Sequence, residues 1–318
     1  MLRATFFLLV VLQVTIVKAF AAETDTLKLD VVSEGYKLDV VLLKKATAVK
    51  EVPVIIFLVG SAGNSSHKTN YKDFAAFFFE QSFLQNGFAV VYFDKRGVGA
   101  SEGKWYETTF EQRALDAKNV ALAVKELKFT NKEKLFVVGH SQGGWIVQLA
   151  LANYPDVFAG GISMAGPVFS VKKQLVNDYQ SKYICNKGFG ESKAYQKAVT
   201  KTKRILFFSS VFGNRGNLKQ LKLIKRFEPQ PYLLTIRKPL LLLFAENDEL
   251  VNIDWCMQEL QQIFPDGRPP VIETYKAAGE THSFKLAPKC YKGERVTRFY
   301  SENTRKKIYD WVVTVGVL

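Results

Sequence analysis

The sequence predicts an α/β fold with a mostly parallel, twisted sheet and helices on both of its faces. Short apolar runs alternate along the chain with longer segments of helical periodicity, which favours right-handed strand–helix–strand units. These runs are apolar at nearly every position, as is typical of strands covered on both sides. The runs lie at 53–59, 88–93, 134–138, 158–164, 239–245 and 271–275.

Helices are predicted between these runs, and a hairpin before them. The helical segments are 72–85, 109–128, 141–153, 253–264 and 302–313. Ahead of the first buried run, 26–32 and 36–43 have the pattern of two paired strands around Glu34-Gly35, a sequence that suits a tight turn.

The strand–helix alternation stops between 168 and 232. This basic stretch lies between two predicted strands, so it is an insertion into the sheet domain. We expect a core formed by 23–167 and 233–318, with 168–232 as a mainly helical, basic cap.

The charge of the chain is concentrated in this cap. The whole chain carries a formal charge of +14, yet 172–226 contain fourteen Lys or Arg and only two acids, Asp178 and Glu191. The apolar residues Leu218, Leu221, Ile224 and Phe227 recur there beside basic ones. Such a helix either binds an anionic membrane or acidic ligand, or covers a pocket with its apolar side. We favour the pocket cover, and no nucleic-acid motif accompanies the charge.

Residues 1–22 have the features of a signal peptide. A positive start is followed by an apolar stretch over 4–17 and by the small-x-small pattern Ala19-Phe20-Ala21. An uncleaved membrane anchor is the alternative, but the apolar stretch is shorter than the roughly 20 residues that span a bilayer. We therefore expect a secreted or periplasmic protein.

Three cysteines lie outside that segment: Cys185, Cys256 and Cys290. An oxidising compartment would allow one disulfide and leave one thiol over. Three buried thiols are an equal alternative, and the sequence does not choose a pair.

The candidate nucleophile is Ser141. It lies in Gly139-His140-Ser141-Gln142-Gly143, a G-x-S-x-G pattern between a predicted strand and a predicted helix. A sharp turn there would expose the serine hydroxyl, and the flanking glycines would remove side chains that collide with the strand or helix. The simpler alternative is a serine that only caps the helix.

A serine hydroxyl needs a base to take its proton, and the chain has three histidines. His140 is adjacent to Ser141 and should point away from it. His282 follows the last predicted strand, where active-site groups of parallel sheets gather, whereas His67 lies in an earlier loop. We expect His282 to be the base, with His67 as a minor alternative.

The imidazole in turn needs a carboxylate to fix its tautomer. Asp248 follows the run at 239–245 and completes the order serine, acid, histidine; Glu246 and Glu249 are neighbouring alternatives. Two backbone N–H groups should hold the oxyanion. We expect these to be the N–H groups of Gln142 and Ser61, with Ala62 as the alternative to Ser61.

In these motifs the chain resembles the α/β-hydrolase superfamily, and in particular its serine aminopeptidase-like and esterase-like members. The matching pieces are LVGSAG, YFDKRGVGASEG, VVGHSQGG, LLLLFAENDELV and GETHSF, in family order over about 53–285. The resemblance implies that the turn at 94–101 is structural. Many relatives have His-Gly where this chain has Val59-Gly60, a departure that keeps the backbone donor but removes the histidine side chain.

Together these features predict a serine hydrolase that cleaves carboxylic esters or thioesters through an acyl-enzyme on Ser141. Its partner would be a small acyl substrate, and the chemistry requires no cofactor and no metal. An amino- or oligopeptidase is the first alternative. A non-catalytic protein of the same fold, binding a lipid or a partner through the cap, is the second.

Overall fold

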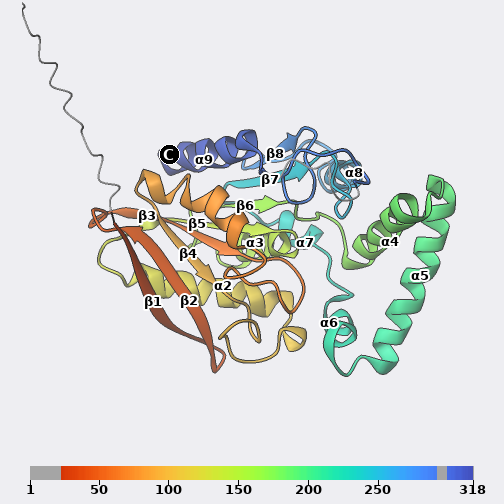
Figure 1. Cartoon of the computed structure of the whole chain (residues 1–318), viewed down its shortest axis with the longest axis horizontal. Helices are drawn as coiled ribbons and strands as arrows, with labels where there is room; N and C mark the ends of the chain where they lie inside the picture. The colour runs from red at the N-terminus through yellow and green to blue at the C-terminus, as the bar shows by residue number, and fades with distance from the viewer. Residues whose placement is uncertain (1–22, 292–298, 318) are drawn as a thin grey trace, which may run out of the picture.

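An eight-stranded sheet forms the centre of the molecule, in the order β1-β2-β4-β3-β5-β6-β7-β8 (Figure 1). This computed structural model describes residues 23–291 and 299–317, so the predicted signal peptide lies outside the described residues. The strands are β1 (Thr24–Ser33), β2 (Tyr36–Lys45), β3 (Val52–Leu58), β4 (Ala89–Phe93), β5 (Thr130–His140), β6 (Gly160–Met164), β7 (Leu240–Ala245) and β8 (Ile272–Ala277).

Only the first strands of the sheet are antiparallel. β2 pairs antiparallel with β1 and with β4, and all later neighbours are parallel. Each of the six predicted buried runs overlaps one strand from β3 to β8. The predicted fold class, a mostly parallel sheet between helices, is confirmed.

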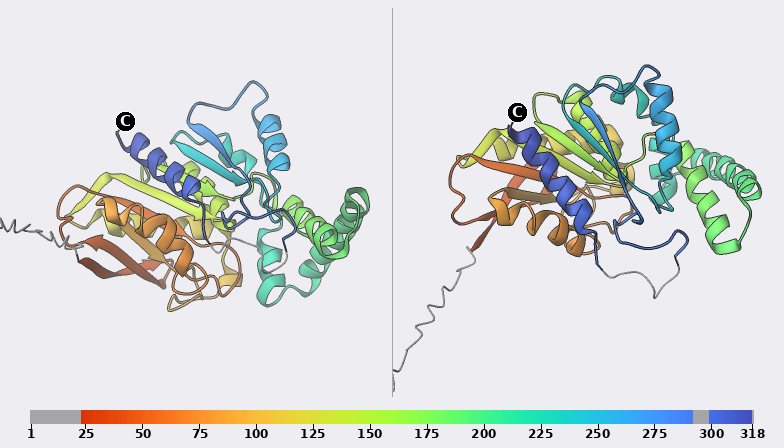
Figure 2. Two further views of the ribbon diagram at one scale, coloured as in Figure 1. Left: turned by 45° about the horizontal axis from the view of Figure 1, so that its top comes forward. Right: turned by 90° about the horizontal axis from the view of Figure 1, so that it is seen from above.

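Alternate residues of the central strands pack into two separate cores. In β3, Val54 and Ile56 face a core shared with α2 (Phe110–Lys125) and α3 (Gln142–Asn153). Ile55 and Phe57 face the other core, which α9 (Glu302–Val317) and the aromatic segment after residue 71 cover. Figure 2 shows this segment and α9 side by side on one face of the sheet. Because both faces are covered, the strands are apolar throughout.

The aromatic segment differs from the single helix predicted over 72–85. It consists of α1 (Lys72–Ala75), a π-helical turn (Ala76–Glu80) and a 3-10 turn (Leu84–Asn86). The neighbouring side chains of Phe78 and Phe79 are both fully buried. In a regular α-helix with a narrow apolar stripe, adjacent residues point in different directions, so one of the two rings would lie at the edge of the stripe. This is a physical reason for the wider π-helical turn at Ala76–Glu80.

Between β6 and β7 the chain leaves the sheet and forms the cap helices. These are α4 (Val171–Lys187), α5 (Glu191–Phe212), α6 (Gly216–Ile224) and the short α7 (Gln230–Leu233). Ser170 caps the start of α4 by accepting a bond from the Lys173 N–H, and Gly188 ends the helix in a left-handed conformation. α4 and α5 stand beside α8 (Ile253–Ile263) at one side of the molecule (Figures 1 and 2).

A disulfide joins the cap to the core. Cys185, near the end of α4, is bonded to Cys290, which follows the loop of His282, and the two are 105 residues apart in sequence. Cys256 is a buried free thiol in α8. The structure therefore has one disulfide and one thiol, the first of the two alternatives that the sequence left open.

Loss of this disulfide should destabilise the protein. Because it closes a long loop, we expect the double variant Cys185→Ser/Cys290→Ser to lose about 2–4 kcal/mol of unfolding free energy. Urea denaturation of variant and wild type, each with and without a reductant, measures the difference. A reduced wild type as stable as the oxidised one would contradict a structural role for the bond.

Candidate active site

Ser141 lies at the sharp turn from β5 into α3. Its φ and ψ are 55° and −121°, a conformation rare for a residue with a side chain. The turn is held because the Ser141 N–H donates to the Met164 carbonyl at 2.8 Å. A Cβ on Gly139 would collide with the backbone of Gly143, and one on Gly143 with the backbone of Leu58. The glycines of the motif are therefore required by space around the turn.

His282 and Asp248 lie at the same end of the sheet, after β8 and β7. His282 Nδ1 is 2.7 Å from Asp248 Oδ2. The other oxygen of Asp248 accepts the N–H groups of Leu250 at 2.7 Å and Val251 at 2.9 Å, which fixes the carboxylate. Because Asp248 accepts the Nδ1 proton, the Nε2 of neutral His282 is left as the basic atom.

The alternative acid Glu246 and the alternative base His67 are engaged elsewhere. Glu246 pairs with Lys276 at 2.6 Å and accepts the Gly279 N–H at 2.8 Å. His67 is buried away from the serine, with its Nδ1 3.0 Å from Asp94. Among the acids considered, only Asp248 contacts His282.

The pKa of His282 lies above its ordinary value. Burial lowers it, but the charge and hydrogen bond of Asp248 and the charge of Asp178 outweigh that effect. A raised pKa makes His282 a stronger proton acceptor, and it also means that the imidazole is neutral only at correspondingly higher pH.

The loops of Ser141 and His282 are joined through His140 rather than through the serine hydroxyl. His140 Nε2–H donates to the His282 carbonyl at 2.8 Å, and the two rings are 4.7 Å apart between centroids. No hydrogen bond links Ser141 Oγ to the His282 ring, although both residues are described. Catalytic hydrogen bonds of this kind often tighten only when substrate is bound.

Tyr71 extends this connection to the loop after β3. Because His140 Nε2 is a donor, its Nδ1 must accept, and the Tyr71 hydroxyl donates to it at 2.8 Å. The same hydroxyl accepts the Gly60 N–H at 3.1 Å. Burial and the neighbouring His282 lower the pKa of His140 to about 3, which keeps it in this neutral form. The sequence has no signal that marks Tyr71.

Two buried cations hold the same loop. Arg113 donates to the Val59 carbonyl at 2.8 Å and to the Gln142 side chain at 2.6 Å, and Lys95 donates to the Gly60 carbonyl at 2.7 Å. Burial lowers the pKa of Arg113 to about 10. The loop that has Val59-Gly60 in place of His-Gly is thus supported by other residues.

A cavity of about 430 Å³ opens above Ser141, and both expected oxyanion donors, Ser61 and Gln142, line it. The cap helices contribute both apolar side chains and polar ones, such as Gln174 and Gln220, to its walls. The apolar ones from α6 are Leu218, Leu221 and Ile224, so the apolar side of this helix covers the pocket, as the favoured sequence interpretation expected. Phe227 lies beyond the end of α6 and packs on Phe110 and Trp145.

One carboxyl group lines this cavity, in which the other described lining residues are uncharged. Asp178 of α4 lines the cavity and accepts a hydrogen bond from the Gln174 side chain at 2.7 Å. Burial raises the pKa of Asp178 to about 6, although Gln174 and nearby cations counteract it. The group is therefore largely ionised at neutral pH and places a negative charge within the substrate cavity.

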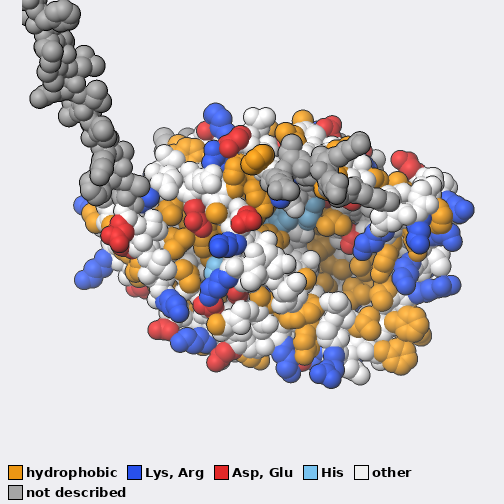
Figure 3. Space-filling model, in the orientation of Figure 1, with side chains coloured by type: hydrophobic (Ala, Val, Ile, Leu, Met, Phe, Trp, Pro, Cys, Tyr) orange, Lys and Arg blue, Asp and Glu red, His pale blue; other side chains and the backbone are white. Residues whose placement is uncertain are grey.

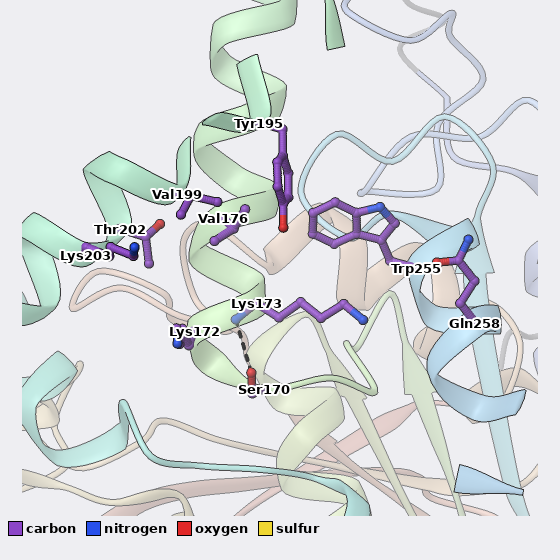
Figure 4. Close-up of a pocket in the computed structure, with 10 residues that line it drawn as sticks. All are labelled: Ser170, Lys172, Lys173, Val176, Tyr195, Val199, Thr202, Lys203, Trp255 and Gln258. Atoms are coloured by element: carbon purple, nitrogen blue, oxygen red, sulfur yellow. Dashed lines mark hydrogen bonds between the residues drawn. The ribbon is translucent and has the colours of Figure 1, made fainter. Parts of the chain in front are cut away.

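A second cavity of about 540 Å³ lies between α4, α5 and α8, on the other side of α4 (Figure 4). Tyr195 and Trp255 stand over it, and Lys173 extends beneath them. It contains none of the candidate catalytic residues. Lys173 pairs there with Glu259 at 2.6 Å, which ties α4 to α8.

The described residues bring one group of potential metal ligands together: Cys185, Cys290 and Glu249. The two sulfurs are bonded to each other in the disulfide, so neither is a thiolate ligand.

Replacement of Tyr71 by Phe tests the connection between the loops. In Tyr71→Phe the buried His140 Nδ1 and Gly60 N–H lose their partner, and we expect about 1–3 kcal/mol less unfolding free energy. Hydrolysis should also slow, because the loop of Ser61 is less fixed. Tyr309→Phe is the control, since the structure gives that hydroxyl no hydrogen bond. Equal unfolding free energies for the two variants would show that the hydrogen bonds of the Tyr71 hydroxyl do not stabilise the fold.

Comparison with known proteins agrees with this architecture. Residues 54–263 match the family described as serine aminopeptidase, S33. An esterase of Pyrococcus furiosus is similar in structure, with a TM-score of 0.61 and 17% identity over 92% of this chain and 91% of that chain. Est1E of Butyrivibrio proteoclasticus, solved with ferulic acid, has a TM-score of 0.59 and 16% identity over 91% of this chain and 99% of its own.

At such identities the structural likeness establishes the fold alone. A search of curated proteins finds no sequence match. The family match covers most of the chain, from β3 to the end of α8. The chain therefore belongs to the serine aminopeptidase S33 family of α/β hydrolases.

Proposed function

We propose that the protein hydrolyses carboxylic esters or thioesters through an acyl-enzyme on Ser141. The observation that carries the proposal is the bonded pair His282–Asp248 at the same end of the sheet as the strained turn of Ser141. The apolar cavity above Ser141 suits an acyl group, and similar structures include esterases. Structural similarity at such low sequence identity supports the hydrolase fold, and the substrate class rests on the cavity and the candidate catalytic residues.

In the proposed mechanism, His282 Nε2 takes the proton of Ser141 as the serine oxygen attacks the substrate carbonyl. The N–H groups of Gln142 and Ser61 hold the oxyanion of the tetrahedral intermediate. Its collapse breaks the ester bond, and His282 returns the proton to the leaving alcohol or thiol. Water, activated by His282, then releases the acid and restores Ser141.

We also propose that the chain is exported. Disulfides persist mainly in oxidising compartments, so the Cys185–Cys290 bond supports the predicted signal peptide. Mass spectrometry of the mature N-terminus after expression in an exporting host tests this proposal.

The acyl-enzyme mechanism predicts labelling of wild type by a fluorophosphonate probe and no labelling of Ser141→Ala. Wild type should hydrolyse p-nitrophenyl esters, and Ser141→Ala should lose at least about 10³-fold in kcat/KM, because no nucleophile remains. A folded wild type that neither takes the probe nor cleaves any ester would instead favour a non-catalytic, ligand-binding protein.

The position of Asp178 supports a second candidate function, the hydrolysis of amine-bearing substrates such as peptides with a free N-terminus. Its carboxylate is the one charged group among the described residues that line the cavity, and the bond from Gln174 engages one of its two oxygens. A substrate ammonium group would satisfy the other oxygen and its charge.

Asp178→Asn separates the two candidates. If Asp178 binds an ammonium group, kcat/KM should fall about tenfold or more for aminoacyl p-nitroanilides or aminoacyl esters, and far less for neutral esters. Equal losses for both substrate types would exclude this role.

The same variant should change the pH profile. Removal of a negative charge near His282 lowers the pKa of the imidazole, so the base stays neutral to lower pH. The acidic limb of the kcat/KM profile for a neutral ester should therefore move to lower pH. The wild-type profile in the same buffers is the reference, and an unchanged acidic limb in Asp178→Asn would contradict the predicted effect on His282.

A further inference from the structure

The outer face of α5 carries two kinds of side chain in sequence along the helix. Residues three or four positions apart lie on one face of a helix, and both groups follow this spacing. The basic half comprises Lys193, Lys197, Lys201 and Arg204, and the apolar half comprises Phe207, Phe208, Val211 and Phe212. We call these eight residues the outer face of α5.

The basic half of this face is exposed and unneutralised. None of its four cations forms an ion pair with any residue of the described parts of the chain. They line a shallow hollow of about 510 Å³ together with Tyr183. The Lys193 and Lys197 ammonium groups lie 4.7 and 5.7 Å from the centre of the Phe189 ring. Unpaired cations around a hollow are suited to phosphate groups.

The apolar half is unusually exposed for large side chains. Phe207, Phe208, Val211 and Phe212 are 63%, 47%, 51% and 59% exposed. The Phe208 ring lies 6.0 Å from both Phe207 and Phe212, so the rings form one cluster. Figure 3 shows basic side chains along the right edge of the molecule and exposed aromatic rings below them. Clustered apolar side chains on a protein surface mark interaction sites.

We propose that the outer face of α5 docks the protein onto an anionic membrane surface. The four cations would contact lipid phosphates, and the aromatic end would enter the boundary between headgroups and acyl chains. A lipid surface fits better than a second copy of this chain, because 172–226 carry fourteen basic residues against two acids and two such caps would repel each other. Within the described residues no helix has the length and apolar character of a bilayer span.

The inner side of the same helix reaches the catalytic cavity. Ile205, two residues before Phe207, lines the cavity that contains Ser141. Docking through the outer face would therefore bring this cavity to the lipid surface. Membrane binding through the outer face of α5 does not require Ser141 to be a nucleophile.

Vesicle co-sedimentation of the mature protein tests the proposal. We expect binding to vesicles of phosphatidylcholine with phosphatidylglycerol, little binding to phosphatidylcholine alone, and release as salt rises from about 0.1 to 0.5 M. Lys197→Gln/Lys201→Gln should bind about 25-fold more weakly, because each cation near an anionic surface contributes about fivefold. Phe207→Ser/Phe212→Ser should bind at least about tenfold more weakly, because two rings no longer enter the membrane.

Matched controls are available outside α5. Phe299→Ser removes another exposed Phe, 79% accessible, and Lys28→Gln/Lys132→Gln removes two exposed cations from the core domain. The proposal is overturned if anionic vesicles do not bind wild type, if neutral vesicles bind it equally, or if the α5 variants bind like these controls. Sedimentation velocity without lipid provides the other test: a dimer that Phe207→Ser/Phe212→Ser dissociates would assign this face to a second copy.

Discussion

The turn at Ser141 constrains the rest of the candidate active site, because its backbone geometry fixes where the serine side chain leaves the chain. β5 lies at the middle of the sheet, and α3 begins directly after the serine. Gly143 lets α3 approach the backbone of Leu58, and Gly144 lets it approach Ser163 and Gly166. The groups proposed to act with Ser141 must therefore come to this end of β5, and Asp248 and His282 lie there because β7 and β8 run parallel to β5.

The surroundings of the turn are arranged by buried polar groups that do not meet the substrate carbonyl. Arg113 bonds both the Val59 carbonyl and the Gln142 side chain, so one cation positions the two segments that carry the expected oxyanion donors. His140 and Tyr71 connect those segments to the loop of His282. Donors fixed before the substrate arrives need little reorganisation during the reaction, which is the main way in which such sites stabilise charge.

The sequence was sufficient for the features that depend on local pattern. Buried strands, the G-x-S-x-G turn and the position of His282 after the last strand are all visible in short windows of sequence. The sequence pattern does not choose among Glu246, Asp248 and Glu249. Three acids so close on one loop differ in the direction of their side chains, which a local pattern does not contain. Asp248 is distinguished by the N–H groups of Leu250 and Val251, which hold its carboxylate toward His282.

Features that depend on contacts distant in sequence could not be predicted. Tyr71 is 69 residues from His140, and Cys185 is 105 from Cys290. The single helix expected over 72–85 was wrong because the burial of adjacent phenylalanines against the sheet outweighed helical spacing. In each case tertiary packing, which a local pattern does not contain, decided the outcome.

The cap shows how binding and stability can be divided among neighbouring helices. α4 is tied to the core by the disulfide and by the Lys173–Glu259 pair, and α6 by the pair of Lys219 with Glu107 at 2.6 Å. α5 packs between these two helices and buries Ala194, Ala198 and Thr202 on its inner side. Within the described part of the chain, its outer face forms no disulfide and no ion pair to the core, and two of its cations contact the neighbouring Phe189 ring. The four cations and the exposed aromatic cluster of this face are therefore the side chains of the cap on which the proposed membrane docking rests.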